Sequence, residues 1–90
     1  MSYRMSLKRS KLEIYLEILK VVSKGTDKPT RIMYKTNLSW KPLMTALESV
    51  LEQGLLRRNE KGTHSAYEIT DKGKNVLKYF REAKELIEIR

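Results

Sequence analysis

The chain has 90 residues and carries 19 lysines and arginines against 11 aspartates and glutamates, a formal net charge of +8 at pH 7. This length suits one small domain with one core, and this charge favours an anionic partner, nucleic acid first and an anionic membrane surface second. The lack of cysteine excludes disulfides, thiol catalysis and cysteine-ligated zinc, and we expect a cytosolic protein because neither a membrane span nor a signal peptide is evident.

Residues 10–24 are predicted to form the first helix. Ser10 is followed three residues later by Glu13, which is the pattern of a capping box. Gly25 is expected to end the helix. The apolar residues between these signals recur at helical spacing: Leu12, Leu16, Leu19 and Val22.

Two further helices are predicted between Pro29 and Gly54. Pro29 is favoured in a first helical turn, and the Thr36–Asn37 pair breaks the helix after about two turns. Ser39 is expected to cap the next helix by accepting a hydrogen bond from a first-turn backbone N–H. On a helical wheel the core-facing arc of this third helix holds Leu43, Ala46, Leu47, Val50 and Leu51, and the outer arc holds Lys41, Thr45, Ser49 and Glu52.

After Gly54 the apolar period changes. The stretches "LLRR" and "SAYEIT" flank a polar segment, which predicts a two-stranded hairpin with Gly62 near its tip. Thr70 and Asp71 are expected to open a last helix. Its apolar residues are spaced 4, 3 and 4 apart and predict a dimerisation seam made of Val76, Phe80, Ala83 and Ile87.

The order helix, helix, turn, helix, hairpin, helix is that of a winged helix-turn-helix, a mainly α fold with a small β-hairpin. Residues 1–70 would form the DNA-binding domain and residues 71–90 the dimerisation helix. The first turns of the second helix of such a motif enter the major groove of duplex DNA. The predicted contacts there are Ser39, Trp40, Lys41 and Thr45, although Trp40 fits a packing residue between the two helices better than a groove contact.

Two basic clusters complete the predicted DNA-binding surface. Residues 1–65 hold 13 basic and 6 acidic residues, a balance of +7, whereas residues 66–90 hold 6 and 5, a balance of +1. The excess therefore lies on the part expected to touch DNA. The N-terminal arm supplies Arg4, Lys8, Arg9 and Lys11, and the hairpin supplies Arg57, Arg58 and Lys61.

Three stretches, "TRIMYKTNLSW", "GLL" and "YEITDKG", occur in this order along the chain. Together with "KLEI" in the first helix they resemble the small archaeal winged-helix DNA-binding proteins, over roughly residues 10–77. The resemblance implies a homodimer joined by an antiparallel coiled coil of C-terminal helices, which presents two winged domains to double-stranded DNA. It leaves open whether the protein is a transcriptional regulator or a chromatin-type, nucleoid-associated binder.

Other classes of function fit the sequence less well. The single histidine, His64, has no partner at the spacing of a metal site or catalytic triad, so we expect no catalytic residue, metal or cofactor. A membrane-surface helix is disfavoured because Glu82, Glu85 and Glu88 interrupt the lysines of the last helix. RNA binding would need an aromatic stacking surface that is not evident.

The main alternative is a degenerate winged helix that binds protein. Glu48 and Glu52 favour it, because carboxylates on the outer face of the third helix would repel phosphates. Lys41 and the two basic clusters oppose it.

Overall fold

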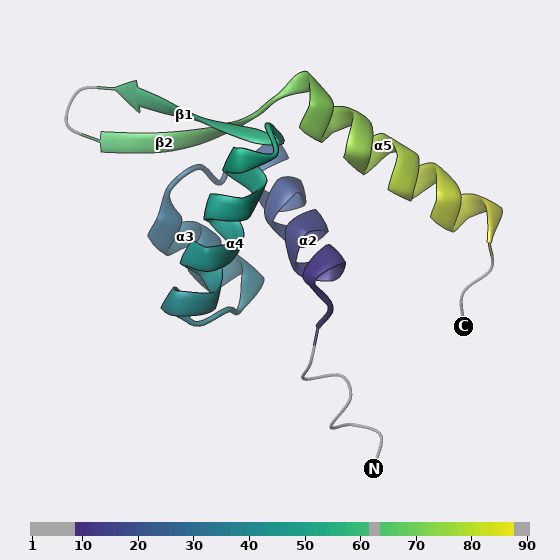
Figure 1. Cartoon of the computed structure of the whole chain (residues 1–90), viewed down its shortest axis with the longest axis horizontal. Coiled ribbons are helices and arrows are strands. Elements are labelled where there is room, and N and C mark those ends of the chain that lie inside the picture. The colour runs from purple at the N-terminus through teal and green to yellow at the C-terminus, as the bar shows by residue number, and fades with distance from the viewer. Residues whose placement is uncertain (1–8, 62–63, 88–90) are drawn as a thin grey trace, which may run out of the picture.

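A computed structural model describes residues 9–61 and 64–87 of the chain. The described residues form four helices and one two-stranded antiparallel sheet (Figure 1), so the predicted mainly α fold with a small hairpin is confirmed. In chain order the elements are α2 (Lys11–Ser23), α3 (Pro29–Thr36), α4 (Trp40–Glu52), β1 (Leu56–Lys61), β2 (His64–Ile69) and α5 (Asp71–Leu86).

Helix α2 starts at the predicted capping box. The Ser10 hydroxyl accepts from the Glu13 backbone N–H at 3.1 Å, and the Glu13 carboxylate accepts from the Ser10 N–H at 2.8 Å. Hydrogen bonds to the Glu13 carboxylate from the Ser10 backbone N–H and from the Ser10 hydroxyl, and then the nearby charge of Arg9, lower the pKa of Glu13 from its ordinary value of 4.5. Helix α2 ends at Ser23, and Gly25 follows with a φ of 105°, which glycine adopts without strain.

Helices α3 and α4 form the predicted helix-turn-helix. Pro29 occupies the first turn of α3, and Asn37 adopts the left-handed conformation that turns the chain between the two helices. Ser39 lies at the N-cap of α4 as predicted, but its side chain makes no capping hydrogen bond, and that expectation was wrong. Pro42 at the third helical position has no N–H, so one of the two backbone donors that an N-cap side chain can use is absent.

The core lies between the three N-terminal helices and the hairpin. Four of the five predicted core residues of α4 are buried, while Leu51 is only partly buried and packs against the edge of the cluster. The buried apolar residues are Ile18, Leu19, Val22, Ile32, Leu43, Ala46, Leu47, Val50, Leu55, Leu56 and Tyr67.

The hairpin is attached to the helical body at its base. Leu56 pairs with Ile69, and Lys61 pairs with His64 at the last described pair, so the predicted tip at Gly62 lies outside the described residues. The Tyr67 backbone N–H donates to the Asp27 carbonyl oxygen at 2.9 Å. This bond ties β2 to the loop between α2 and α3.

Helix α5 starts in close contact with the turn that follows α4. The Thr70 hydroxyl contacts the Gly54 carbonyl oxygen at 2.6 Å and accepts from the Gly73 N–H at 3.1 Å. A Cβ atom at Gly73 would lie 2.2 Å from the carbonyl oxygen of Leu55. Only glycine therefore allows the first turn of α5 to approach this closely.

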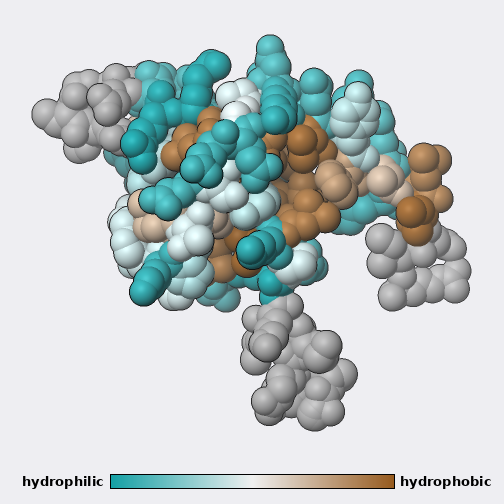
Figure 2. Space-filling view, in the orientation of Figure 1, coloured by the Kyte–Doolittle hydropathy of each residue, from teal (hydrophilic) through white to brown (hydrophobic). Residues whose placement is uncertain are grey.

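Beyond its first two turns α5 diverges from α2 and leaves the helical body (Figure 1). Val76 and Leu77 pack against the core, whereas Phe80, Ala83 and Ile87 are exposed. Apolar surface accordingly follows the inner side of α5 and its end (Figure 2). No helix among the described residues has the length and apolar character needed to cross a membrane.

Candidate nucleic-acid interface

The first two turns of α4 present polar side chains to solvent. Lys41 and Thr45 are both exposed and lie one helical turn apart. The Thr45 hydroxyl donates to the Lys41 carbonyl oxygen at 3.1 Å, which leaves its methyl group and its oxygen lone pairs available. Lys41 has no ion-pair partner among the described side chains. The start of α4 therefore offers one free cation and one small hydroxyl to a ligand.

The residues beside this pair have different surroundings. Ser39 is exposed at the N-cap, and Trp40 is 47% exposed and does not belong to the core. Ser49, which the helical wheel places on the outer arc, is instead half-buried, because its hydroxyl accepts from the Tyr15 hydroxyl at 2.8 Å. The outward face of α4 is thus narrower than the wheel predicts.

The C-terminal half of α4 is acidic. Glu48 and Glu52 are exposed and line a shallow surface depression with Thr45, Ser49 and Leu51. Within the described part of the chain, no three histidine, cysteine or acidic side chains are placed to hold a metal ion. Two carboxylates on this half of the helix would repel a polyanion from it.

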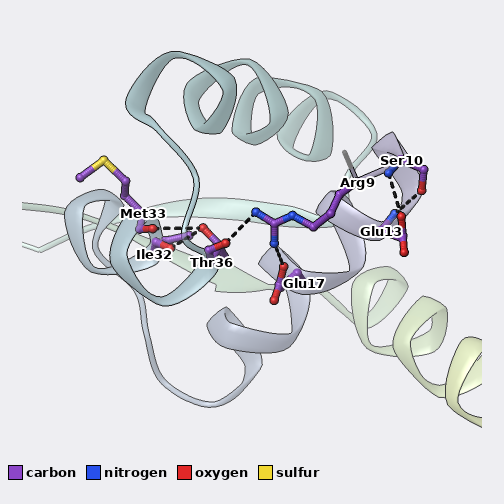
Figure 3. A network of polar contacts seen from close by, with 7 residues as sticks. All are labelled: Arg9, Ser10, Glu13, Glu17, Ile32, Met33 and Thr36. Atoms are coloured by element: carbon purple, nitrogen blue, oxygen red, sulfur yellow. Dashed lines mark hydrogen bonds and ion pairs between the residues drawn. The ribbon is translucent and has the colours of Figure 1, made fainter. Parts of the chain in front are cut away.

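The N-terminal cluster is described only from Arg9 onwards, and Arg4 and Lys8 lie outside the described residues. Lys11 is exposed on the first turn of α2. Arg9 is half-buried, and its guanidinium donates to the Glu17 carboxylate and to the Thr36 carbonyl oxygen, the latter at 2.8 Å (Figure 3). Arg9 is therefore engaged within the protein.

Arg57 and Arg58 point to opposite faces of the hairpin, because successive side chains alternate along a strand. Arg57 forms an ion pair of 2.7 Å with Glu68, its cross-strand partner. Arg58 lies over the ring of Tyr67, with 5.9 Å between its guanidinium carbon and the ring centroid. The side chain of Lys61 lies outside the described part of the structure. The two guanidinium groups therefore lie on opposite faces of the hairpin and have different partners.

Helix α3 carries basic residues that the sequence reasoning did not select. Arg31 and Lys35 are exposed one turn apart, with Tyr34 between them at 77% exposure. Their spacing of four residues in "TRIMYKT" was a usable signal, since it places both cations on one helical face. The first helix of a helix-turn-helix crosses the DNA backbone, and cations suit that position.

The elements that carry these residues lie on the same side of the molecule. The hairpin projects on the side of α3 and α4, and α5 extends away on the other side (Figure 1). The elements α3, α4 and the hairpin thus lie on the side of the molecule away from the end of α5.

Solved structures share this fold. The DNA-binding protein Sso10a-2 of Sulfolobus solfataricus has a TM-score of 0.74 at 24% identity, with 87% of this chain and 81% of that chain covered. The transcriptional regulator BldR of the same organism has a TM-score of 0.66 at 21% identity, with 84% and 63% covered. At these identities the likeness is one of fold.

Two uncharacterised proteins of Methanocaldococcus jannaschii are similar in sequence. One is 33% identical over 80 residues, which are 89% of this chain and 78% of the relative. The other is 37% identical over 82 residues, which are 91% of this chain but only 37% of that longer relative. A sequence model described as winged helix-turn-helix matches residues 8–88. Since that match extends from α2 through the hairpin to the end of α5, the chain belongs to the winged helix-turn-helix family.

Proposed function

We propose that this protein binds double-stranded DNA through the start of α4. The observation that carries the proposal is the pair of exposed residues Lys41 and Thr45 on a helix whose opposite face is fixed in the core. A lysine at this position can reach a phosphate or a guanine, and a threonine can reach a phosphate or a thymine methyl group. The free N–H groups of the first turn add a positive dipole end that favours phosphate.

The flanking elements would add contacts to the phosphate backbone. In this proposal Arg31 and Lys35 of α3 would contact the strand beside the groove, and the hairpin would contact an adjacent phosphate or the minor groove. Lys11 would contribute further charge, as would Arg4 and Lys8 of the N-terminal arm. Because Glu48 and Glu52 limit base contacts, we propose modest sequence discrimination, in keeping with a chromatin-type, nucleoid-associated binder or a weakly selective regulator.

We also propose that residues 1–70 bind DNA and residues 71–90 join two protomers. The support is the exposed apolar surface of Phe80 and Ala83 on α5 and of Ile87, which lies at the C-cap just after the helix in an extended conformation. A dimer would bring two recognition helices to one duplex, which raises affinity without any new contact type.

A salt titration of duplex binding tests the proposed function. If about four cations per protomer meet phosphates, a dimer neutralises about eight, and log affinity should fall against log salt with a slope near −7. Two duplexes of unrelated sequence should give similar slopes, because phosphate contacts carry no sequence information. A slope near zero, or no binding at low salt, would contradict DNA binding.

The contribution of the hairpin can be measured in the same assay. Replacing Arg57 and Arg58 together with Ala should flatten the slope by roughly one to two per protomer if both meet phosphates. Each single variant is needed as well, because only Arg57 has to leave an ion pair with Glu68 before it can contact DNA. We expect Arg58→Ala to have the larger effect.

A protein-binding module is the second candidate, and the exposed carboxylates of Glu48 and Glu52 favour it. Under this alternative the basic surface is only solvated. Duplex binding would then be absent at low salt, and charge reversal at Glu48 and Glu52 would not create it.

A further inference from the structure

The guanidinium of Arg9 connects three parts of the fold. Arg9 precedes the N-cap of α2, Glu17 lies in the middle of α2, and Thr36 is the last residue of α3. Figure 3 shows the guanidinium between the Glu17 carboxylate and the Thr36 carbonyl oxygen, with a hydrogen bond to each. The side chain of Arg9 is only 27% exposed, so it lies along the protein surface and not in solvent.

The end of α3 needs such a contact. The last carbonyl groups of a helix have no partner within the helix, and they carry the negative end of the helix dipole. Thr36 is 1% exposed, and its hydroxyl donates back to the Ile32 carbonyl oxygen at 2.7 Å, so that side chain does not tie the turn to another element. Arg9 supplies both the positive charge and the missing donor.

The residues after Thr36 make this contact relevant to α4. Asn37 is the one non-glycine residue with positive φ in the described part of the chain, and a backbone in this region is usually held there by its surroundings. The Leu38 backbone N–H donates to the Met33 carbonyl oxygen at 3.3 Å, which is long for a backbone hydrogen bond. Trp40 and Lys41 then begin α4, so a shift at Thr36 moves the start of the recognition helix.

We propose that Arg9 is a positioning residue that fixes the turn between α3 and α4, and that it is not a phosphate contact. The expected effect on affinity rests on the proposed DNA binding. The effect of Arg9 on the position of the turn can be tested in the free protein. This role of Arg9 differs from that of Lys11, although the two cations are separated only by Ser10.

Two variants of Arg9 separate the roles by their salt dependence. Arg9→Gln and Arg9→Lys should both weaken duplex binding roughly tenfold, the size of one hydrogen bond to a charged group, and neither should change the salt slope. Lysine keeps the charge but lacks the planar fork that spans two acceptors. If Arg9 met a phosphate instead, lysine would preserve affinity and glutamine would flatten the slope by about 0.9 per protomer.

Trp40 reports the position of the turn without DNA. It is the only tryptophan of the chain and the first residue of α4, half-exposed in the folded protein. Well below the melting temperature, Arg9→Gln and Arg9→Lys should each change the acrylamide quenching of Trp40. Tyr15→Phe is the matched control, because it removes the 2.8 Å bond from α2 to Ser49 and leaves the turn intact.

The control variant should lower the melting temperature and leave Trp40 quenching as in the wild type. Unchanged quenching in both Arg9 variants would overturn the proposal, as would a slope reduced by Arg9→Gln with affinity kept by Arg9→Lys. If the wild type binds no duplex, the proposed function fails, and the quenching comparison still decides whether Arg9 holds the turn.

Discussion

Lys41 and Thr45 are both exposed. Within the described residues, the one side-chain hydrogen bond that either of them makes is the local bond from the Thr45 hydroxyl to the Lys41 carbonyl oxygen. A side chain that packs against nothing can be removed without loss of stability. It can therefore be tested for binding without the confounding effect of unfolding.

We predict that Lys41→Ala weakens duplex binding on all sequences and flattens the salt slope by about 0.9 per protomer, with an unchanged melting temperature. Thr45→Ala should act unevenly between sequences if its methyl group reads a base. Lys74→Ala is the matched control, since Lys74 is also exposed but lies on α5. Equal affinities for wild type and both α4 variants would remove this helix from the interface.

The capping box predicts a pH dependence of stability. Because the pKa of Glu13 is lowered in the folded state, its stabilising contribution is complete above the ordinary value of 4.5 and is lost as pH falls through the folded pKa. The difference in melting temperature between wild type and Glu13→Gln should therefore be constant at neutral pH and shrink in acid. Thermal melts from about pH 7 to about pH 3 measure it. A difference that grows in acid would contradict the sign.

Sequence reasoning at this scale recovered residues whose role depends on local chemistry. Ser10, Glu13 and Asn37 act through neighbours a few residues away, which a reader of the sequence can see. Arg9 and Ser49 were interpreted as surface residues, but their partners lie 8 to 34 positions away. No local pattern indicates a hydrogen bond between segments so distant in sequence.

At the scale of elements, the first turn of α5 packs so closely against the Leu55 carbonyl that position 73 has no space for a side chain. The order and type of every element were predictable, because caps, glycines and changes of apolar period mark each boundary. The closeness of Gly73 to the Leu55 carbonyl was not predictable, since glycine within a helix is otherwise only a weak helix former.

Gly73→Ala should consequently destabilise the protein by about 1–3 kcal/mol, although alanine is the better helix former. A Cβ atom 2.2 Å from a backbone oxygen forces the first turn of α5 away from Leu55. Chemical denaturation measures the change. A control is Asn75→Ala, at an exposed position of the same helix, which should be neutral or slightly stabilising. A stabilised Gly73→Ala variant would show that the contact is loose.

For the whole molecule, the predicted seam on α5 divides between two environments. Val76 packs on the chain's own core, and Phe80, 38% exposed, lines a surface depression between α5 and α2. Ala83 and the C-cap residue Ile87 are exposed. Heptad spacing indicates an apolar stripe but not which neighbour covers each part of it, because that depends on the angle between α5 and α2.

We expect the exposed part of the stripe to hold a dimer at tens of micromolar protein, and Ile87→Asp to dissociate it by placing a charge in the interface. Ile87 is 59% exposed in the monomer, so the variant should remain folded. Asn75→Asp adds the same charge on the polar face of α5 and should leave the dimer intact. Sedimentation measures both. A wild type that sediments as a monomer would end the dimer proposal.

The bond between the Tyr67 N–H and the Asp27 carbonyl has a consequence for solubility. It occupies part of the outer edge of β2, whereas no backbone hydrogen bond to another element is found along β1 within the described residues. Open strand edges recruit other chains into larger sheets, and charged side chains along them oppose this. Arg57 and Arg58 stand on β1. Their replacement by Ala should promote aggregation as well as weaken DNA binding, so light scattering belongs beside every affinity measured on those variants.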